Sequence, residues 1–418
     1  MHILFLTHYF LPETNAPANR VLELGREWVR LGHRVTVVTS APNHPTGKLH
    51  LGYKNKLLFR ETIDGIEVIR LWTFLAANEG FLFRTTNYVS FMLSSALQSF
   101  RLPRPDVVVS TSPQFFCGLA GYLVSRLKRR PWTLEIRDLW PESIVAVGAM
   151  TNKPAIALLE SLERFAYRKA ARVVTVTDSF VNHVAKRGAT REKIGVIKNG
   201  VDLSTFTGDA DATAFRAEHG LTGKYVAAYV GTHGMAHQLE TVLDAAALTR
   251  DDPAIAFLMV GGGAERARLL AERDKRGLTN VVMLDQQPRT AMPVIWGASD
   301  VSLVLLRNSP LFETVLPSKM FEAMGMRRPM ILGVRGEALA LMTEAASGIG
   351  IEPGNAVELA AAVRHLAADP KLANALGQSG RRFVEANFDR KVLARRYIDI
   401  LERLVPQPIH VAAMRGAQ

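Results

Sequence analysis

The most informative chemical groups of the chain lie in the run Glu313–Gly325. Pro317 and Ser318 favour the start of a helix, and the free amides of a helix N-terminus attract anions. Lys319 beside that start can neutralise a diphosphate, and Glu322, one helical turn further, can accept hydrogen bonds from the two hydroxyls of a ribose. The run therefore predicts a nucleotide site. The alternative is a capped amphipathic helix with a solvated Lys319.

A second group of reactive side chains lies in the run Glu135–Ser143, which ends a predicted strand and holds three carboxylates, an arginine and a tryptophan. Asp138 can bind a hydroxyl, and Trp140 can stack on the face of a sugar ring. The alternative is structural: Arg137 pairs with Glu142 while Trp140 packs in the core.

Two further loops connect a predicted strand to a predicted helix. The loop 8–17 contains Glu13 and Asn15 and ends at a helix N-terminus, which suits an anion or a polar acceptor. It has no Gly-x-Gly, so the nicotinamide-binding fingerprint is absent there. The glycines Gly261–Gly263 let a ligand approach the backbone closely. Both patterns also occur in ordinary strand-to-helix loops.

The sequence predicts no metal site. Asp209 and Asp211 form an Asp-x-Asp pattern, but they precede a predicted helix and are interpreted as capping residues. His233 and His237 are four residues apart after a strand and do not form a convincing ligand pattern. The single cysteine, Cys117, excludes a disulfide framework and a cysteine-based zinc site, and is expected to be buried and inert.

Strands that alternate with helices are predicted to position these groups. Several strands are continuous apolar runs, such as Val107–Val109, which is typical of parallel strands covered on both faces. Such sheets bind ligands at the carboxyl ends of their strands. We therefore predict an α/β fold of two doubly wound units, joined near 199–209, with a site in the cleft between them. The predicted strands are His2–Thr7, Arg34–Thr39, Ile66–Leu71, Asp106–Ser110, Trp132–Arg137, Arg172–Thr177 and Ile194–Lys198, then Tyr225–Val230, Ala256–Val260, Val281–Leu284, Asp300–Leu306, Met330–Val334 and Gly348–Ile351.

The positive charge of the chain is concentrated in its first half. The 418 residues carry a net charge of +12; residues 1–203 hold 27 Lys and Arg against 16 Asp and Glu, and residues 204–418 hold 24 against 23. This asymmetry predicts a basic face that meets phospholipid, a phosphate-bearing acceptor or nucleic acid; the alternative is a merely solvated surface. We expect neither a secretory signal nor a membrane span, since no stretch reaches ~20 unbroken apolar residues.

Several motifs resemble glycosyltransferase family 4. Val196–Asp202 resembles the hinge segment of that family, Tyr229–Gly234 the strand and loop that open its nucleotide domain, and Pro317–Met324 its donor helix. Pro12–Ala16 and Arg137–Ser143 resemble a branch that builds O-antigen, capsule and exopolysaccharide and includes fucosamine-type transferases. The resemblance covers nearly the whole chain. It implies the GT-B fold, in which two doubly wound Rossmann-like domains face each other across a cleft.

Four segments are expected on this basis. Residues 1–200 would form an N-terminal Rossmann-like acceptor domain, and residues 201–388 a C-terminal Rossmann-like nucleotide-sugar domain. Residues 389–405 would form a terminal helix that returns to the N-terminal domain, and residues 406–418 a flexible tail.

The roles that the resemblance implies fall into three groups. Donor binding is expected of Glu322, Lys319, Ser318, Gly231, Thr232, His233, Gly262 and Gln286. Catalytic roles are expected of Asp138, Glu13 and Thr314, and acceptor binding of Asn15, Trp140 and Glu142. No metal ligand is expected.

The chain departs from the family at two places in the donor site. The family has two glutamates separated by seven residues; the second matches Glu322, whereas the first position holds Thr314. The family's basic pair after the Gly231 loop is absent. We therefore expect Lys319, Lys198 or backbone amides to neutralise the diphosphate.

The resemblance implies a metal-independent, retaining glycosyltransferase. It would move a sugar from a nucleotide-sugar, UDP-linked by family default, to a polyprenyl-diphosphate-linked or polysaccharide acceptor in cell-surface glycan synthesis. The nucleotide-sugar is a co-substrate, and no cofactor or nucleic-acid partner is expected. The protein would be cytoplasmic and peripherally bound to the inner face of an anionic membrane, through 81–100 and 113–130.

Two alternative functions stay open from the sequence. One is a nucleotide-sugar 2-epimerase on the same fold, and the other is a non-enzymic module that binds membranes or nucleic acid. The donor sugar, the acceptor, the linkage and the oligomeric state are also open.

Overall fold

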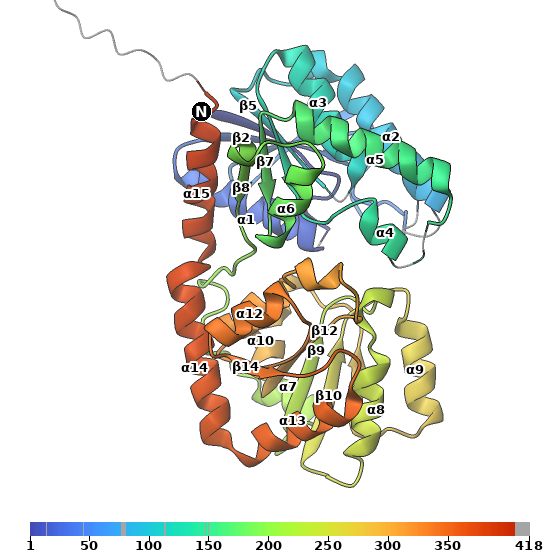
Figure 1. Ribbon diagram of the computed structural model, residues 1–418, viewed down its shortest axis with the longest axis vertical. Helices are drawn as coiled ribbons and strands as arrows, with labels where there is room; N and C mark the ends of the chain where they lie inside the picture. Colours follow the sequence, from blue (N-terminus) through green and yellow to red (C-terminus); the bar gives the residue numbers. More distant parts are fainter. Residues whose placement is uncertain are drawn as a thin grey trace, which may run out of the picture.

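The computed structural model describes residues 1–13, 15–44, 46–76, 81–112, 114–146, 148 and 150–405. Figure 1 shows two α/β lobes stacked along the long axis of the molecule, with the last two helices running along one side of both. The tail predicted at 406–418 lies outside the described residues, as do Thr14 and Pro113 of the predicted loops and helices.

The first lobe is built on an eight-stranded sheet of order β3-β4-β2-β1-β5-β6-β7-β8. Each pair of neighbours is parallel except β3 and β4. Its strands are β1 (His2–Leu6), β2 (Arg34–Ser40), β3 (Leu58–Ile63), β4 (Ile66–Leu71), β5 (Val107–Thr111), β6 (Trp132–Ile136), β7 (Arg172–Thr175) and β8 (Ile194–Val196). Its helices are α1 (Ala16–Arg30), α2 (Phe81–Leu97), η1 (Ser99–Arg101), α3 (Phe115–Lys128), α4 (Glu142–Ala146), α5 (Lys153–Lys169), α6 (Ser179–Lys186) and η2 (Arg191–Lys193).

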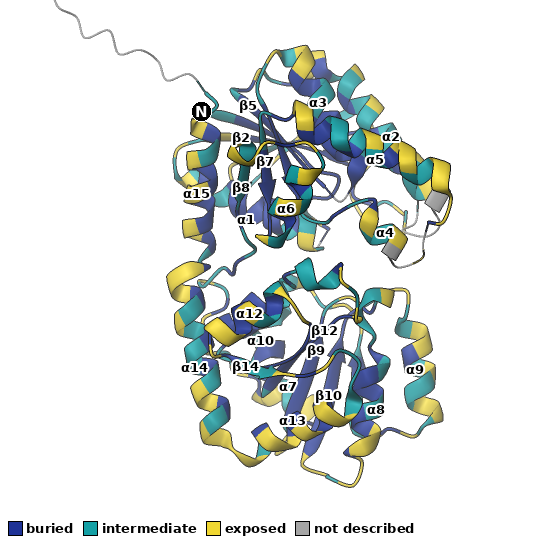
Figure 2. Ribbon diagram, viewed as in Figure 1, coloured by how far each residue is buried: buried dark blue, intermediate teal, exposed yellow. Residues whose placement is uncertain are grey.

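Successive residues of the central strand β1 point to opposite faces of this sheet. Ile3 and Phe5 pack with α1 and with the last helix of the chain, whereas Leu4 and Leu6 pack in the cluster formed by α3, α5 and α6. Both faces are therefore buried, as the continuous apolar runs predicted, and Figure 2 shows the strands dark blue between helices with exposed outer faces.

The edge strand β3 was not predicted. Its partly buried residues alternate with exposed ones, so it lacks the continuous apolar run of the other strands. It pairs antiparallel with β4 through the turn Asp64-Gly65, in which both residues have positive φ, 52° and 79°. An Asp-Gly dipeptide is typical of two-residue hairpins, and it is the signal that identifies this strand.

The second lobe is built on a six-stranded sheet of order β11-β10-β9-β12-β13-β14. Each pair of neighbouring strands in this sheet is parallel. The strands are β9 (Tyr225–Val230), β10 (Ile255–Val260), β11 (Val281–Leu284), β12 (Val301–Leu305), β13 (Met330–Gly333) and β14 (Gly348–Gly350). The helices are α7 (Thr213–Glu218), η3 (Met235–His237), α8 (Glu240–Leu248), α9 (Arg266–Lys275), η4 (Arg289–Ala291), α10 (Met292–Gly297), η5 (Phe312–Thr314), α11 (Lys319–Gly325), α12 (Glu337–Glu344), α13 (Ala356–Ala368) and α14 (Pro370–Asn387).

The chain passes between the lobes twice, and the two crossings pair with each other. The amide of Val201 donates to the carbonyl of Phe388, and the amide of Arg390 donates to the carbonyl of Val201, each at 3.0 Å. The second crossing continues as α15 (Arg390–Glu402), which packs on α1 of the first lobe. There Trp28 donates to the carbonyl of Ala394 at 3.1 Å. The division of the chain at residue 200 stays a prediction.

The sequence predicted neither a membrane span nor a metal site at Asp209 and Asp211. Within the described residues, no helix is both long and apolar enough to cross a membrane. Asp211 accepts the amide of Thr213, the first residue of α7, at 2.9 Å, and Asp209 pairs with Arg327 at 2.9 Å. Asp211 therefore holds the start of α7, as interpreted from the sequence, whereas Asp209 is an ion-pair partner of Arg327 and not a capping residue.

Candidate functional site

The carboxyl-terminal edges of the two sheets face each other. Asp178 and Ser179 follow β7 of the first lobe, and Glu337 follows β13 of the second. The Glu337 carboxylate accepts the amides of Asp178 and Ser179 at 3.1 and 2.8 Å, and it pairs with Lys198 at 3.2 Å. Lys198 also pairs with Asp178 at 2.6 Å. Its charge is thus already compensated, so it is poorly placed to neutralise a diphosphate.

Helix α11, the predicted donor helix, places Lys319 next to the glycine loop that follows β9. Ser318 occupies the N-cap position but makes no side-chain capping bond. The Nζ atom of Lys319 lies 3.4 Å from the centroid of the Tyr229 ring, and a Cβ added at Gly231 would lie 3.1 Å from it. This ammonium is buried and has no hydrogen-bond acceptor among the described residues. Burial lowers the pKa of Lys319 to about 7, although Glu322 raises it slightly.

The loops that follow β9 and β10 touch through their backbones. Gly231, Gly261 and Gly263 have φ of 142°, 152° and 148°. A Cβ at Gly261 would lie 1.9 Å from the carbonyl oxygen of Gly231, and one at Gly263 would lie 2.5 Å from that of His233. Only glycine fits such an approach. The sequence left the role of this glycine turn open, and the structure shows why it needs glycine.

The other predicted donor residues lie around these loops. The amide of His233 donates to the carbonyl of Gly262 at 2.8 Å, and the carbonyl of Thr232 accepts the Tyr229 hydroxyl at 2.8 Å. A Cβ on Gly262 would lie 3.7 Å from Oε1 of Gln286, which follows β11. The structure thus brings the predicted donor residues of the second lobe into one region.

His233 is a buried imidazole inside this region. Neither of its ring nitrogens has a partner among the residues that the structure describes. Burial, followed by the charges of Arg266 and Lys319, lowers its pKa to about 4, so the ring is neutral at pH 7. Its unpaired nitrogens can hydrogen-bond to a ligand. No group of three His, Cys, Asp or Glu within the described ranges is arranged to hold a metal ion.

Glu322 projects from the same helix, one turn beyond Lys319. Its Oε1 lies 3.5 Å from Nη1 of Arg289, and its Oε2 accepts Nε1–H of Trp296 at 3.4 Å. Burial raises the pKa of Glu322, and Arg289 and Trp296 oppose that rise. Both contacts are long, so the carboxylate can still accept hydroxyl groups.

Glu13 is a buried carboxylate whose oxygens accept backbone amides. It is 2 % exposed, and its oxygens accept the amides of Phe10 at 3.3 Å and of Asn43 and His44 at 2.9 Å. It therefore ties the loop after β1 to the loop after β2. Asn15 caps α1 by accepting the amide of Ala18 at 3.0 Å. The catalytic role predicted for Glu13 is not favoured by this placement, because three amides occupy its oxygens.

The run after β6 divides into packing and polar residues. Trp140 stacks on Phe115, with ring centroids 4.9 Å apart, so this indole face is used in packing. Glu142 pairs with His183 at 3.2 Å. The alternative pair of Arg137 and Glu142 is therefore wrong: burial lowers the pKa of Arg137 to about 10, and the acidic groups that raise it are Glu135 and Asp138.

Asp138 and Thr314 lie on opposite lobes. Burial raises the pKa of Asp138, and Ser143 is the main group that opposes the rise. The Thr314 hydroxyl donates to the carbonyl of Leu311 at 2.6 Å, and Leu311 itself packs into the core cluster of the first lobe. The loop that carries Thr314 thus connects the two lobes, although the Thr314 hydroxyl donates its proton within the loop itself.

Comparisons with known proteins agree with this geometry. Residues 15–200 match the Glycosyl transferase 4-like domain, and residues 211–383 match the Glycosyl transferases group 1. The chain belongs to glycosyltransferase family 4. A putative colanic acid biosynthesis glycosyl transferase of Escherichia coli, WcaI, is 26 % identical over 89 % of this chain and 93 % of its own length.

Solved structures establish that this glycosyltransferase has the GT-B fold. Sucrose-phosphate synthase from Thermosynechococcus elongatus aligns with a TM-score of 0.75 at 19 % identity, covering 96 % of this chain and 98 % of the other. Anabaena HepE, solved with UDP and glucose, aligns with a TM-score of 0.73 at 18 % identity, covering 96 % and 99 %.

Sequence reasoning missed three members of this glycosyltransferase's site region. Arg289 follows β11 and reaches Glu322; Trp296 donates to the same carboxylate; and Glu23 of α1 contacts Arg289 from the first lobe. A basic residue just after a strand that ends at the cleft was an available signal for Arg289. Glu23 gave no signal, because it lies within the apolar face of α1.

Proposed function

We propose that this glycosyltransferase moves a sugar, with retention of configuration, from a nucleotide-sugar to an acceptor in cell-surface glycan synthesis. The observation that carries the proposal is the buried ammonium of Lys319, which has no acceptor among the described residues. A buried charge is costly unless it is paired. A diphosphate next to the Gly231 and Gly261 loops would supply the missing partner, with no metal ion required.

The donor would lie across α11 and the glycine loops. Its diphosphate would meet Lys319 and the backbone amides, with neutral His233 available as a hydrogen-bond donor. Its ribose hydroxyls would donate to Glu322, whose present contacts are only 3.4 and 3.5 Å long. Gln286, which lies near Gly262, would contact the nucleoside. The UDP bound to HepE, on the same fold, supports a uridine donor.

The transfer would depend on positioning more than on a protein base. The bond between the anomeric carbon and the phosphate oxygen breaks, and the acceptor oxygen bonds to the same face of that carbon. The acceptor proton passes to the leaving phosphate oxygen, which Lys319 stabilises. Preorganised charges lower such a barrier without moving during the reaction. Asp138, on the opposite edge of the cleft, would orient a hydroxyl of the acceptor or donor.

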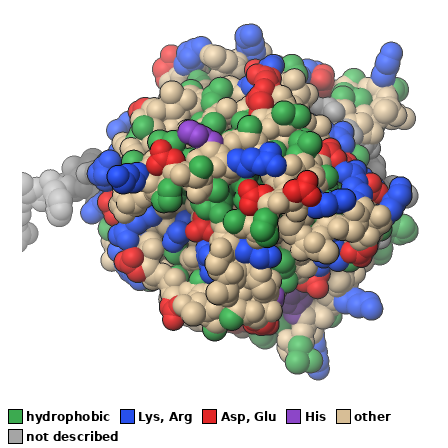
Figure 3. Space-filling model, turned by 90° about the horizontal axis from the view of Figure 1, so that it is seen from below, with side chains coloured by type: hydrophobic (Ala, Val, Ile, Leu, Met, Phe, Trp, Pro, Cys, Tyr) green, Lys and Arg blue, Asp and Glu red, His purple; other side chains and the backbone are tan. Residues whose placement is uncertain are grey.

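The acceptor would be presented at a cytoplasmic membrane surface. Helix α2 and the turn η1 expose Phe83, Leu93, Leu97 and Phe100, and α3 exposes Leu127 beside the basic run Arg126–Arg130. Apolar side chains next to basic ones favour an anionic lipid surface. Figure 3 shows the far end of the second lobe, where acidic and basic side chains are interspersed. A polyprenyl-diphosphate-linked glycan is the proposed acceptor, and the name of WcaI supports a cell-surface glycan.

A thermal-shift screen against UDP, GDP, ADP and their common sugar conjugates tests the donor site. A ligand that binds only the folded protein raises its melting temperature. We expect one nucleotide series to stabilise the protein selectively, and Glu322→Ala to abolish that shift. If no nucleotide shifts the wild type, the proposed donor site is wrong. Consumption of a donor without any acceptor would instead favour the epimerase.

A further inference from the structure

Arg289 lies between two carboxylates that belong to different lobes. It is the first residue of η4 in the second lobe. Its Nη2 is in direct contact with Oε1 of Glu23 on α1 of the first lobe, and its Nη1 lies 3.5 Å from Oε1 of Glu322. One guanidinium therefore joins the first lobe to the carboxylate expected to bind the ribose.

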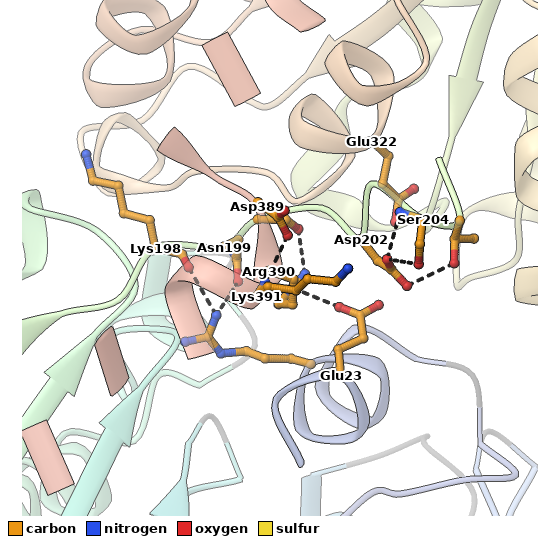
Figure 4. Close-up of polar contacts among 12 residues, drawn as sticks. Glu23, Lys198, Asn199, Asp202, Ser204, Glu322, Asp389, Arg390 and Lys391 are labelled. Atoms are coloured by element: carbon orange, nitrogen blue, oxygen red, sulfur yellow. Dashed lines mark hydrogen bonds and ion pairs between the residues drawn. The ribbon is translucent and has the colours of Figure 1, made fainter. Parts of the chain in front are cut away.

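Glu23 is held firmly at the crossing between the lobes. Its side chain is 5 % exposed, and its second oxygen lies 2.9 Å from Nε of Arg390. Arg390 in turn donates to the carbonyl of Gly200, on the other crossing. Figure 4 shows Glu23, from the first lobe, next to Arg390, with Glu322 above them in the second lobe. Glu23 is thus a fixed anchor point for Arg289.

The geometry at Glu322 suits a supporting role for Arg289. At 3.5 Å the guanidinium is an ion-pair partner but not a close hydrogen-bond donor, so it leaves the lone pairs of Glu322 open for hydroxyl groups. Its charge also favours the ionised carboxylate, which accepts hydrogen bonds better than the protonated acid does.

We propose that Arg289 is a positioning residue of the donor site, anchored across the cleft by Glu23, which orients Glu322 to receive the ribose of a nucleoside diphosphate. The inference rests on the proposed nucleotide-sugar donor and extends it to two residues that contact no substrate themselves. The contact of Arg289 with Glu23 requires the relative position of the lobes seen here, whereas its contact with Glu322 lies within the second lobe. Ribose binding and this position therefore favour each other.

The test uses the full chain and isothermal titration with UDP, GDP and ADP, which all contain ribose. The variants are Glu23→Gln, Arg289→Gln and the conservative Arg289→Lys. Glu337→Gln is the matched control, because Glu337 also joins the lobes, through Asp178 and Ser179, and makes no hydrogen bond or ion pair with Glu322 within the described residues. Circular dichroism and melting temperature establish that each variant is folded.

We expect Glu23→Gln to weaken nucleotide binding about tenfold, within the usual range of coupling between linked sites. Arg289→Gln should weaken it at least as much, and Arg289→Lys should restore part of the loss. 2′-Deoxy-UDP should be less sensitive to Glu23→Gln than UDP, because it has one ribose hydroxyl fewer to donate to Glu322. Glu337→Gln should not reproduce this pattern.

The pH profile of binding separates positioning from general loosening. The charged groups around Glu322 are Arg289 on η4, Glu23 on α1, Arg390 on α15 and Lys319 on its own helix. Burial raises the pKa of Glu322 and Arg289 opposes the rise, so Arg289→Gln should raise that pKa further. Affinity should then begin to fall at a higher pH as the solution is acidified. Glu337→Gln should keep the wild-type midpoint.

Each outcome decides a different point. If Glu23→Gln and Arg289→Gln bind nucleotide as the wild type does, with the same pH midpoint, the inference is wrong while the proposed function stands. If Glu337→Gln causes the same loss and the same shift, Arg289 acts only on lobe packing and the inference is also wrong. If the folded wild type binds none of the three nucleotides, the proposed function itself fails. If Arg289→Gln does not fold, Glu23→Gln and Arg289→Lys decide the question.

Discussion

Replacing Lys319 with methionine should stabilise the empty protein and abolish nucleotide binding. The Lys319 ammonium is buried, without an acceptor among the described residues, and its pKa falls from 10.5 to about 7. In the unfolded chain the pKa returns to the ordinary value. Between these two pKa values the unfolded state binds a proton that the folded state lacks. The contribution of Lys319 to stability therefore rises with pH across this window.

The size of the effect follows from the two pKa values. Each unit of difference between the two pKa values corresponds to about 1.4 kcal/mol. The buried lysine therefore lowers the free energy of unfolding by about 5 kcal/mol when the pH is below the folded-state pKa. One pH unit below the unfolded-state pKa, the remaining loss is about 1 kcal/mol. The cation–π contact with Tyr229 returns about 2 kcal/mol. We expect Lys319→Met to raise the free energy of unfolding by about 3 kcal/mol near neutral pH and by little near the pKa of free lysine.

Urea unfolding of the nucleotide-free protein measures this difference at neutral and at alkaline pH. Lys371→Met, at an exposed position of α14, is the matched control and should change stability little at either pH. In the thermal-shift screen, the nucleotide that stabilises the wild type should fail to stabilise Lys319→Met. Equal stability of Lys319→Met and wild type at neutral pH would refute the reasoning that Lys319 is an uncompensated charge. An unchanged nucleotide shift would refute its role at the diphosphate.

Three further predictions follow from single contacts. Gly261→Ala places a Cβ against the carbonyl of Gly231. The variant should therefore lose more than about 2 kcal/mol of stability, together with the rise in melting temperature that the nucleotide causes, and thermal melting measures both. If the nucleotide still raises the melting temperature as it does for the wild type, the glycine contact is dispensable. Glu13→Gln loses charge-assisted hydrogen bonds to three amides and should cost about 2 kcal/mol of stability in urea. Turnover of folded Glu13→Gln should stay near wild type, and a loss of turnover without a loss of stability would restore its catalytic role. Leu97→Glu combined with Phe100→Glu, at side chains each 73 % exposed, should reduce sedimentation with anionic liposomes at low salt; if the wild type does not sediment, the membrane proposal is wrong.

Much of the architecture was predictable because its signals are local. Continuous apolar runs such as Val107–Val109 identified the buried parallel strands, since both faces of such strands pack under helices. Pro317 and Ser318 placed the start of the donor helix within one residue of α11. The edge strand β3 was not predicted because it is short of buried apolar residues and its partly buried residues alternate with exposed ones after Phe59, although the Asp64-Gly65 turn indicated a hairpin.

The candidate site was only partly predictable, because composition does not distinguish a buried polar residue with partners from one without. Glu13 lies in the loop after β1 and Lys319 is the first residue of α11, so each follows a strand end that faces the other lobe. The carboxylate of Glu13 is occupied by amides of a loop 30 residues further along the chain, whereas Lys319 has no acceptor within the described residues. The structural alternative paired Arg137 with Glu142, yet the fold pairs Glu142 with His183.

By itself, then, the sequence determined the two sheets, the order of their buried strands along the chain and the helix that carries Lys319 and Glu322. These depend on residue types within one turn or one strand. Only the tertiary structure decided which charges are compensated and how the two lobes meet, since Glu23, Arg289 and Glu322 come from three distant segments. These three residues meet because the chain passes between the lobes at two places and thereby fixes how the lobes face each other. No pattern within a single helix or strand indicates that such distant segments will come into contact.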